Sequence, residues 1–150
     1  MSGTHIELVR GMTVATHRSG AGVATNLFEF DLTKARPDGY AELSVNWHDS
    51  DEAIQSLLMA EKAPGVPQFR FGAAILPESE IHRIANQPIS RDVIDCERQP
   101  LDGNPYHGNL LLKATTPKPL MKQIAATIAL AVTDIVSRSG SGFIRTPIGT

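Results

Sequence analysis

Alternation of apolar and polar residues is the clearest pattern in the chain, and it predicts β-strands. The two most regular stretches are residues 27–33 and 41–47, where every second side chain is apolar. Their apolar positions are Phe28, Phe30 and Leu32 in the first stretch, and Ala41, Leu43, Val45 and Trp47 in the second. A strand with this period buries one face and exposes the other. Pro37-Asp38-Gly39 lies between them and has turn chemistry, so we expect a hairpin.

Weaker extended patterns predict further strands over residues 6–14, 68–76, 89–98 and 106–114. The first has Arg10-Gly11 in its middle, where we expect a bulge or a break. Pro77 ends the second, and a turn-rich segment over residues 100–105 separates the last two.

Helical spacing of apolar residues predicts three helices, over residues 51–62, 78–85 and 117–138. The last is the longest, and its apolar stripe comprises Leu120, Ile124, Ile128, Val132 and Ile135. Proline is tolerated in a first helical turn, so Pro117 and Pro119 mark its start. Ser139-Gly140-Ser141-Gly142 is expected to end it and to release residues 139–150 as a mobile tail.

These elements together predict a single α+β domain over residues 1–150. We expect a mostly antiparallel sheet of about 4–6 strands, with a short middle helix and the long C-terminal helix packed on one face. The length of 150 residues is typical of one compact domain.

Composition excludes some classes of function. The net charge of −2 comes from interspersed acidic and basic residues, so nucleic-acid binding is not expected. The longest apolar run, residues 124–132, is too short to span a membrane. Cys96 is the only cysteine, which excludes an internal disulfide and predicts a reducing compartment, the cytoplasm.

The densest polar cluster lies at residues 102–109 and contains Asn104 and His107. His107 is the candidate catalytic residue, as a general base or as a group that holds a phosphate or carbonyl, and Asn104 is a candidate binding residue. A tight turn without chemical function fits the same segment, because Asp-Gly and Asn-Pro are ordinary turn formers.

Arg10 and Arg70 are candidate binding residues of a different kind, because each falls inside a predicted strand. A strand arginine that points inward needs an anionic partner or ligand. Outward placement into solvent is the simpler expectation for both.

The remaining candidate clusters support no cofactor or metal. Residues 18–22 form a glycine-containing loop without the lysine of a P-loop or the third glycine of a dinucleotide fingerprint. His48, Asp49 and Asp51 offer metal ligands, but the two aspartates are equally suited to a helix N-terminus. Cys96 alternates with Ile94, which indicates a small buried side chain rather than a nucleophile.

Three short motifs, Ser44-Val45-Asn46, Phe69-Arg70-Phe71 and Asn104-Pro105-Tyr106-His107, occur in this order before the last helix. In this the chain resembles small bacterial proteins that share an S-V-N/D strand, a short F-R or R-F strand and an N-P-x-H turn. The resemblance covers roughly residues 40–136. It implies a bacterial source and a functional role for the N-P-x-H turn, but no reaction.

Two hypotheses of function follow. The first is a small bacterial accessory protein of a multi-component system, which uses its apolar helix face to bind a larger protein partner or a second copy of itself. The second is an enzyme or sensor that acts on a nucleotide or phosphorylated small molecule, with His107 as acid or base and Arg10 or Arg70 as the anion contact. The second requires His107 to lie in a pocket close to an arginine.

Overall fold

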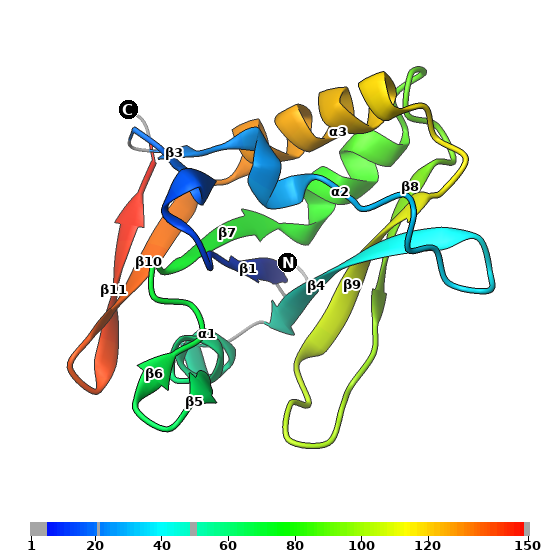
Figure 1. The fold of residues 1–150 in the computed structure, drawn as a ribbon. Coiled ribbons are helices and arrows are strands. Elements are labelled where there is room, and N and C mark those ends of the chain that lie inside the picture. The colour runs from blue at the N-terminus through cyan, green and yellow to red at the C-terminus, as the bar shows by residue number, and fades with distance from the viewer. Residues whose placement is uncertain (1–5, 21, 49–50, 149–150) are drawn as a thin grey trace, which may run out of the picture.

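The computed structural model describes residues 6–20, 22–48 and 51–148 and shows an α+β fold built on one large antiparallel sheet. In the described part of the chain this sheet has seven strands, more than the expected 4–6, in the order β11-β10-β7-β1-β4-β9-β8 (Figure 1). The strands are β1 (Glu7–Gly11), β4 (Tyr40–His48), β7 (Ala73–Pro77), β8 (Ile94–Arg98), β9 (His107–Lys113), β10 (Asp134–Ser139) and β11 (Gly142–Pro147). Each neighbouring pair is antiparallel, as expected.

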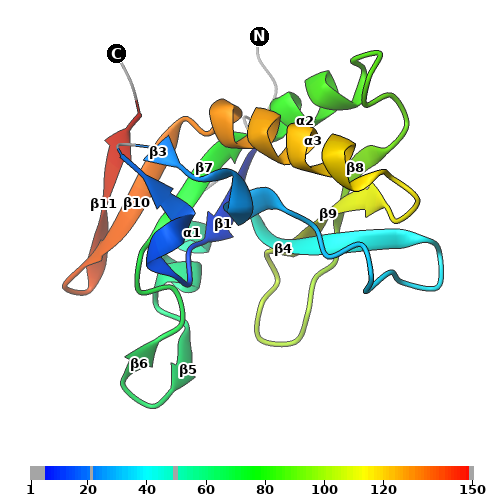
Figure 2. The ribbon, with the colours of Figure 1, turned by 45° about the horizontal axis from the view of Figure 1, so that its top comes forward.

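Helices cover both faces of the sheet. The helices α2 (Glu78–Ala85) and α3 (Lys118–Ala131) lie together on one face, and α1 (Asp51–Leu58) lies on the other (Figures 1 and 2). The larger core lies under α2 and α3 and includes Leu8, Leu110 and Ile128. The smaller core lies under α1 and includes Val9 and Ile75. Neighbouring residues Leu8 and Val9 therefore enter different cores, as strand geometry requires.

Strand β4 confirms the alternation at residues 41–47. Ala41, Leu43 and Val45 are buried, whereas Glu42 and Ser44 between them are exposed. The turn at Pro37-Asp38-Gly39 is also present, with Gly39 at a φ of 88°, where a side chain would be strained.

The strand expected at residues 27–33 is wrong, and so is its hairpin with residues 41–47. A 3₁₀ helix, η2 (Thr25–Phe28), occupies the start of this segment, and the residues after it are irregular. Leu27, Phe28 and Phe30 are all buried in the larger core, where η2 contacts α3. A half-buried strand would expose either Leu27 or Phe28, so burial of both neighbours favours the tight helical turn.

The C-terminal helix is also shorter than expected, because α3 ends at Ala131 rather than near Arg138. Residues 134–147 form the β10–β11 hairpin, so the expectation of a mobile tail at residues 139–150 is wrong for its described part. Strand β10 pairs with β7, and Ile135 and Val136 enter the larger and the smaller core respectively. Residues 132–136 are rich in β-branched side chains, and those of Ile135 and Val136 are buried on opposite faces of the sheet. Both properties favour a strand over a helix.

The other expectations hold to different extents. The helix 78–85 and the strands at 89–98 and 106–114 are confirmed as α2, β8 and β9, the strands with shorter bounds. The helix expected over 51–62 stops at Leu58, and residues 61–67 form the small hairpin of β5 (Glu61–Ala63) and β6 (Val66–Pro67). Of residues 68–76, only the last four are in β7. Strand β1 ends at Gly11, next to the expected break.

The surfaces of the helices bear on the expected protein partner and on membrane association. The apolar face of α3 is covered by the chain itself, since Met121, Ile124, Ala125 and Ile128 are buried in the larger core. Leu130, on the opposite side of the helix, is 88% exposed. Among the described residues, none of the helices combines the length and the apolar character needed to cross a membrane.

Candidate functional site

A split between two strands in the middle of the sheet creates the candidate site. Within the described residues, strands β1 and β4 pair over three residue pairs, Glu7 with His48, Leu8 with Trp47 and Val9 with Asn46. Beyond Val9, β1 continues along β7 and β4 continues along β9, so the two strands separate. A pocket of about 460 Å³ opens at this point, between the two strands, α1 and the turn before β9.

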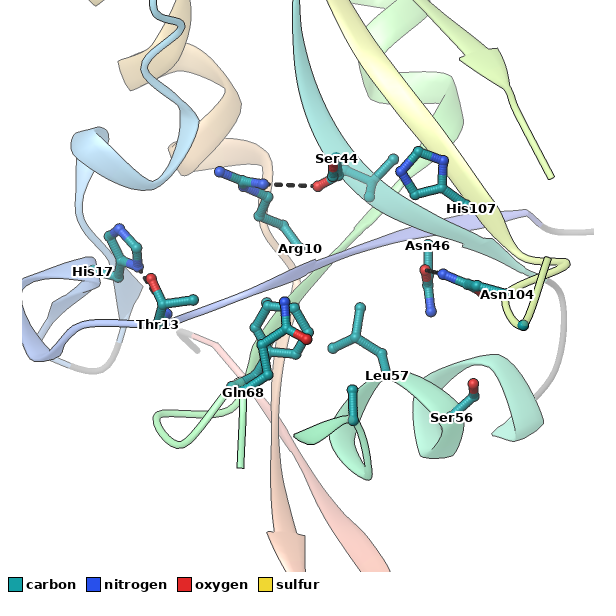
Figure 3. Close-up of a pocket in the computed structure, with 15 residues that line it drawn as sticks. Arg10, Thr13, His17, Ser44, Asn46, Ser56, Leu57, Gln68, Asn104 and His107 are labelled. Atoms are coloured by element: carbon teal, nitrogen blue, oxygen red, sulfur yellow. Dashed lines mark hydrogen bonds between the residues drawn. The ribbon is translucent and has the colours of Figure 1, made fainter. Parts of the chain in front are cut away.

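Arg10 lies at the point of separation and points into the pocket (Figure 3). Its Nε donates to the carbonyl oxygen of Leu27 at 3.1 Å, and its Nη1 donates to the carbonyl oxygen of Ser44 at 2.8 Å. Where a sheet separates, backbone carbonyls lose their strand partners, and the guanidinium replaces one of them. The expectation that Arg10 points into solvent is therefore wrong.

The guanidinium of Arg10 faces the pocket and is not paired with an acidic side chain of the described residues. No carboxylate of the described residues forms an ion pair with Arg10, and its Nη2 has no protein acceptor among them. Burial lowers the pKa of Arg10 to about 10, so the side chain still carries its charge at neutral pH. A partly desolvated cation without an acidic partner is the usual condition for binding an anion.

His17 forms part of the opposite wall, close to Arg10. It belongs to the short 3₁₀ helix η1 (Ala15–His17), and its Nδ1 accepts a hydrogen bond of 3.3 Å from the backbone N–H of Thr13. An accepting Nδ1 carries no proton, so Nε2 carries it in the neutral ring. Burial and the positive charge of Arg10 lower the pKa of His17, which favours the same neutral form.

His107 and Asn104 reach the pocket from the other side, at the start of β9 and in the turn before it (Figure 3). The Nδ1–H of His107 donates to the carbonyl oxygen of Gln99 at 3.0 Å, which leaves Nε2 of the neutral ring as an acceptor. Asn104 donates from Nδ2 to Oδ1 of Asn46 at 2.9 Å, and its own Oδ1 accepts from the N–H of Tyr106 at 3.2 Å. The hydrogen bonds of His107 and Asn104 together hold the turn before β9 in one position.

An apolar wall completes the pocket, formed by Val45, Leu57, Ala60 and Phe69. Phe69 packs directly on Gly11, because a Cβ built on that glycine would lie 2.1 Å from Cδ1 of the phenyl ring. Absence of a side chain at Gly11 therefore allows Phe69 to occupy this wall. The pocket thus combines one cation, neutral hydrogen-bonding groups and apolar surface.

Known proteins do not add to this description. Comparison of the chain with known protein families, curated proteins and solved structures finds no match. Conclusions about function therefore depend on the geometry of the chain's own side chains.

Sequence reasoning identified three of these residues, and the structure brings them into one pocket: Arg10, Asn104 and His107. It places Arg70 elsewhere, exposed in a separate surface hollow with its guanidinium 5.3 Å from the centre of the Phe71 ring. Arg70 therefore does not contact the same ligand site as His107.

Other candidates lie outside the pocket. Asp51 is exposed in the first turn of α1, and Asp49 of the possible metal set lies outside the described residues. Gly20 belongs to the turn of the small β2 (Arg18–Ser19) and β3 (Gly22–Val23) hairpin. Burial, then the charges of Glu78 and Asp95, raise the pKa of Cys96 to about 12, which argues against a free thiolate nucleophile.

Several pocket residues were not predicted as site residues, among them Thr13, His17, Ser44, Asn46 and Gln68. Ser44 and Asn46 occupy the polar positions of the β4 alternation, which predicted a solvent-facing side. In the structure, α1 covers part of that side, and Asn46 is buried with Nδ2 donating to the carbonyl oxygen of Ala53 at 3.3 Å. Nothing in the local pattern indicated this cover.

Proposed function

We propose that this protein binds a small anionic molecule in the pocket between β1 and β4, with Arg10 as the charged contact. The observation that carries the proposal is the guanidinium of Arg10, which faces the pocket without a carboxylate partner among the described residues. Its two carbonyl bonds orient the fork and leave Nη2 for a ligand oxygen.

Electrostatics of the lining support an anion rather than a cation. No Asp or Glu of the described residues lines the pocket, and Arg10 is the one arginine or lysine among the described lining residues. Protonation of His17 would add a second positive charge, which an anion would stabilise. A cationic ligand would meet repulsion from Arg10 and find no counter-charge.

Size and polarity define the class of ligand further. A volume of about 460 Å³ falls in the range of small-molecule sites, roughly 300–1,000 Å³. Phe69 and Leu57 offer apolar contact, while Asn104 and His107 offer hydrogen bonds. This combination suits a phosphate monoester or carboxylate that also carries an apolar or aromatic group.

Binding without turnover is the form of this function that the side chains favour. The hydroxyls of Thr13, Ser44 and Ser56 line the pocket, but none has a hydrogen bond to a histidine ring within the described chain. Nucleophilic catalysis needs a hydroxyl activated in that way. His107 then acts through Nε2 as an acceptor for a ligand hydroxyl or amine, and an acid–base role stays a prediction.

The accessory role with a protein partner also stays a prediction. Its motivating feature, the apolar stripe of the last helix, is covered by the chain's own core. Ligand binding by a sensor or carrier in a reducing, cytoplasmic compartment is compatible with both hypotheses.

Calorimetric titration with two matched pairs of probes tests the proposal: adenosine 5′-monophosphate against adenosine, and benzoate against benzamide. We expect at least one anion to bind at least about tenfold more tightly than its neutral counterpart, as one charge-assisted contact supplies. Arg10→Met should abolish this preference, and Arg70→Met should leave it unchanged.

Two results would overturn the proposal. Equal binding of the charged and neutral members of both pairs would show that Arg10 does not select an anion. Absence of binding by either anion at millimolar concentration, with the protein folded by circular dichroism, would show that the pocket is not a site of this kind.

A further inference from the structure

A second cluster of chemically active side chains lies where α2 packs against β8, and none of its members lines the Arg10 pocket. It consists of Glu78, His82 and Cys96. One ligand atom from each, a carboxylate oxygen, an imidazole nitrogen and the thiol sulfur, lies within 4.8 Å of the other two. Three different metal-ligating groups from two elements therefore converge.

The local structure fixes this convergence. Glu78 is the first residue of α2, and His82 follows four residues later, so both side chains lie on the same face of the helix. The Nε2 of His82 already lies 2.9 Å from Oε1 of Glu78. Strand alternation places Cys96 on the same side of β8 as the buried Ile94, which is the side that faces α2.

The donor set indicates which cation would fit. Metal binding displaces the proton of the Cys96 thiol to solvent, because cysteine ligates as the thiolate. A thiolate, an imidazole and a carboxylate are the ligand types of Zn²⁺, whereas Mg²⁺ and Ca²⁺ prefer oxygen ligands alone. Tetrahedral bonds of about 2.0–2.3 Å place ligand atoms about 3.3–3.8 Å apart. The 2.9 Å between Nε2 of His82 and Oε1 of Glu78 would have to open by about 0.5 Å, and the widest separation, at most 4.8 Å, would have to close by about 1 Å. Rotation of the Glu78 or His82 side chain can provide both changes.

Exposure allows a cation to enter and leaves a coordination position open. The side chain of His82 is 55% exposed and that of Glu78 is 22% exposed, so the cluster opens to solvent on one side. Three protein ligands with one position for water is the arrangement of open zinc sites. Among the described residues, Glu78 has no arginine or lysine partner that would compete with a metal.

We propose that Glu78, His82 and Cys96 form a binding site for Zn²⁺ or a similar borderline-soft divalent cation. The bound ion connects α2 to β8, which is an edge strand of the sheet. Because Cys96 contributes from the strand and the other two ligands from the helix, the ion stabilises the folded arrangement over the unfolded chain. This site is independent of the anion pocket.

The simplest alternative is that Glu78 and His82 form an ordinary ion pair within α2, with Cys96 as a packing residue. Such a pair on a helix surface is common and contributes little to stability. The alternative predicts no metal affinity at this position, so a measurement of metal binding distinguishes the two explanations.

Titration of the full chain with Co²⁺, after treatment with a chelator, measures the site without reference to any activity. We expect a thiolate-to-cobalt charge-transfer band in the near ultraviolet, which Zn²⁺ removes by displacing Co²⁺ and which Mg²⁺ does not affect. Cys96→Ser should lose the band, and His82→Gln should weaken Co²⁺ binding at least about tenfold.

Glu80→Gln is the matched control, because Glu80 lies on the same helix but pairs with Arg83 at 3.0 Å. It should bind Co²⁺ as the unchanged protein does. Absence of a charge-transfer band in the unchanged protein would overturn the proposal, and so would a band that persists with equal affinity in His82→Gln. Zinc should also raise the melting temperature of the unchanged protein but not that of Cys96→Ser.

Discussion

The Nη1 group of Arg10 donates a hydrogen bond of 2.8 Å to the carbonyl oxygen of Ser44, across the point where β1 and β4 separate. This bond joins two strands that no longer pair directly, and it keeps the charge of Arg10 at the pocket. The same side chain therefore connects the two strands and carries the charge that we propose binds an anion.

Arg10→Met tests the structural part of that relationship. Methionine keeps an apolar stem but donates no hydrogen bond, so the carbonyls of Leu27 and Ser44 lose their side-chain donor. We expect the free energy of unfolding in urea to fall by about 1–3 kcal/mol. Arg10→Lys, which keeps a charged donor, should lose less. An increase in stability for Arg10→Met would instead mean that desolvation of the guanidinium outweighs its bonds.

Gly11→Ala tests the wall of the pocket. The added Cβ would lie 2.1 Å from Cδ1 of Phe69, so the phenyl ring must move. We expect a loss of about 1–3 kcal/mol in urea unfolding and weaker anion binding. Phe69→Leu should recover part of the stability in the Gly11→Ala background, because the two side chains compete for the same space. Gly22→Ala is the control, since its Cβ would meet no atom closer than 3.7 Å.

His17 predicts a specific dependence of stability on pH. Burial and the charge of Arg10 lower the pKa of His17 in the folded state below its ordinary value of 6.5. The unfolded chain then takes up the proton at a higher pH, so the contribution of His17 is complete above about pH 6.5 and is lost as pH falls toward the lowered value. Urea unfolding at about pH 5 and about pH 7.5 should show a smaller difference for His17→Gln than for the unchanged protein. An identical difference in both proteins would contradict this assignment.

The contacts of Arg145 connect the C-terminal β10–β11 hairpin to the rest of the sheet. Its Nη1 and Nη2 bind the two carboxylate oxygens of Glu7 at 3.1 and 2.6 Å, and its Nε binds Oδ2 of Asp134 at 2.8 Å. The side chain is 33% exposed, so water screens part of this interaction. We expect Arg145→Met to lower the free energy of unfolding by about 1–3 kcal/mol and to reduce hydrogen-exchange protection in β10 and β11.

Arg138→Met is the matched control for Arg145→Met. Arg138 is exposed on the neighbouring strand and has no ion pair within the described chain. Its substitution should change stability by less than about 0.5 kcal/mol. Equal effects of the two substitutions would show that the contacts of Arg145 with Glu7 and Asp134 do not hold the hairpin in place.

Local patterns predicted those elements whose environment is simple. Residues 41–47 alternate because β4 has one side against the larger core and a largely polar opposite side. The helix α2 was predicted for the same reason, since one face is buried and the other is exposed. In such elements the period of the sequence records which apolar side chains are buried, although it does not show that α1 also covers the polar position Asn46.

Patterns failed where burial does not follow one period. Residues 27–30 contain a strand-like alternation, but Leu27 and Phe28 are buried together beneath α3. Val132, Ile135 and Val136 fit a helix by spacing, yet the free side of β7 offers a strand partner: Ile135 pairs with Ala74. A sheet edge that can satisfy backbone hydrogen bonds is visible only after the chain has folded.

The sequence by itself determined the α+β class, the strand of residues 41–47 and the helix of residues 78–85. It also marked Arg10, Asn104 and His107 as candidate site residues. Only the tertiary structure decided that these three residues share one pocket and that Arg70 does not. They come from β1, from β9 and from the turn before it, and β1 and β9 are brought together through β4. The physical reason is that pairing between strands distant in the sequence fixes the point where β1 and β4 separate. That point places the guanidinium of Arg10 in the pocket between them.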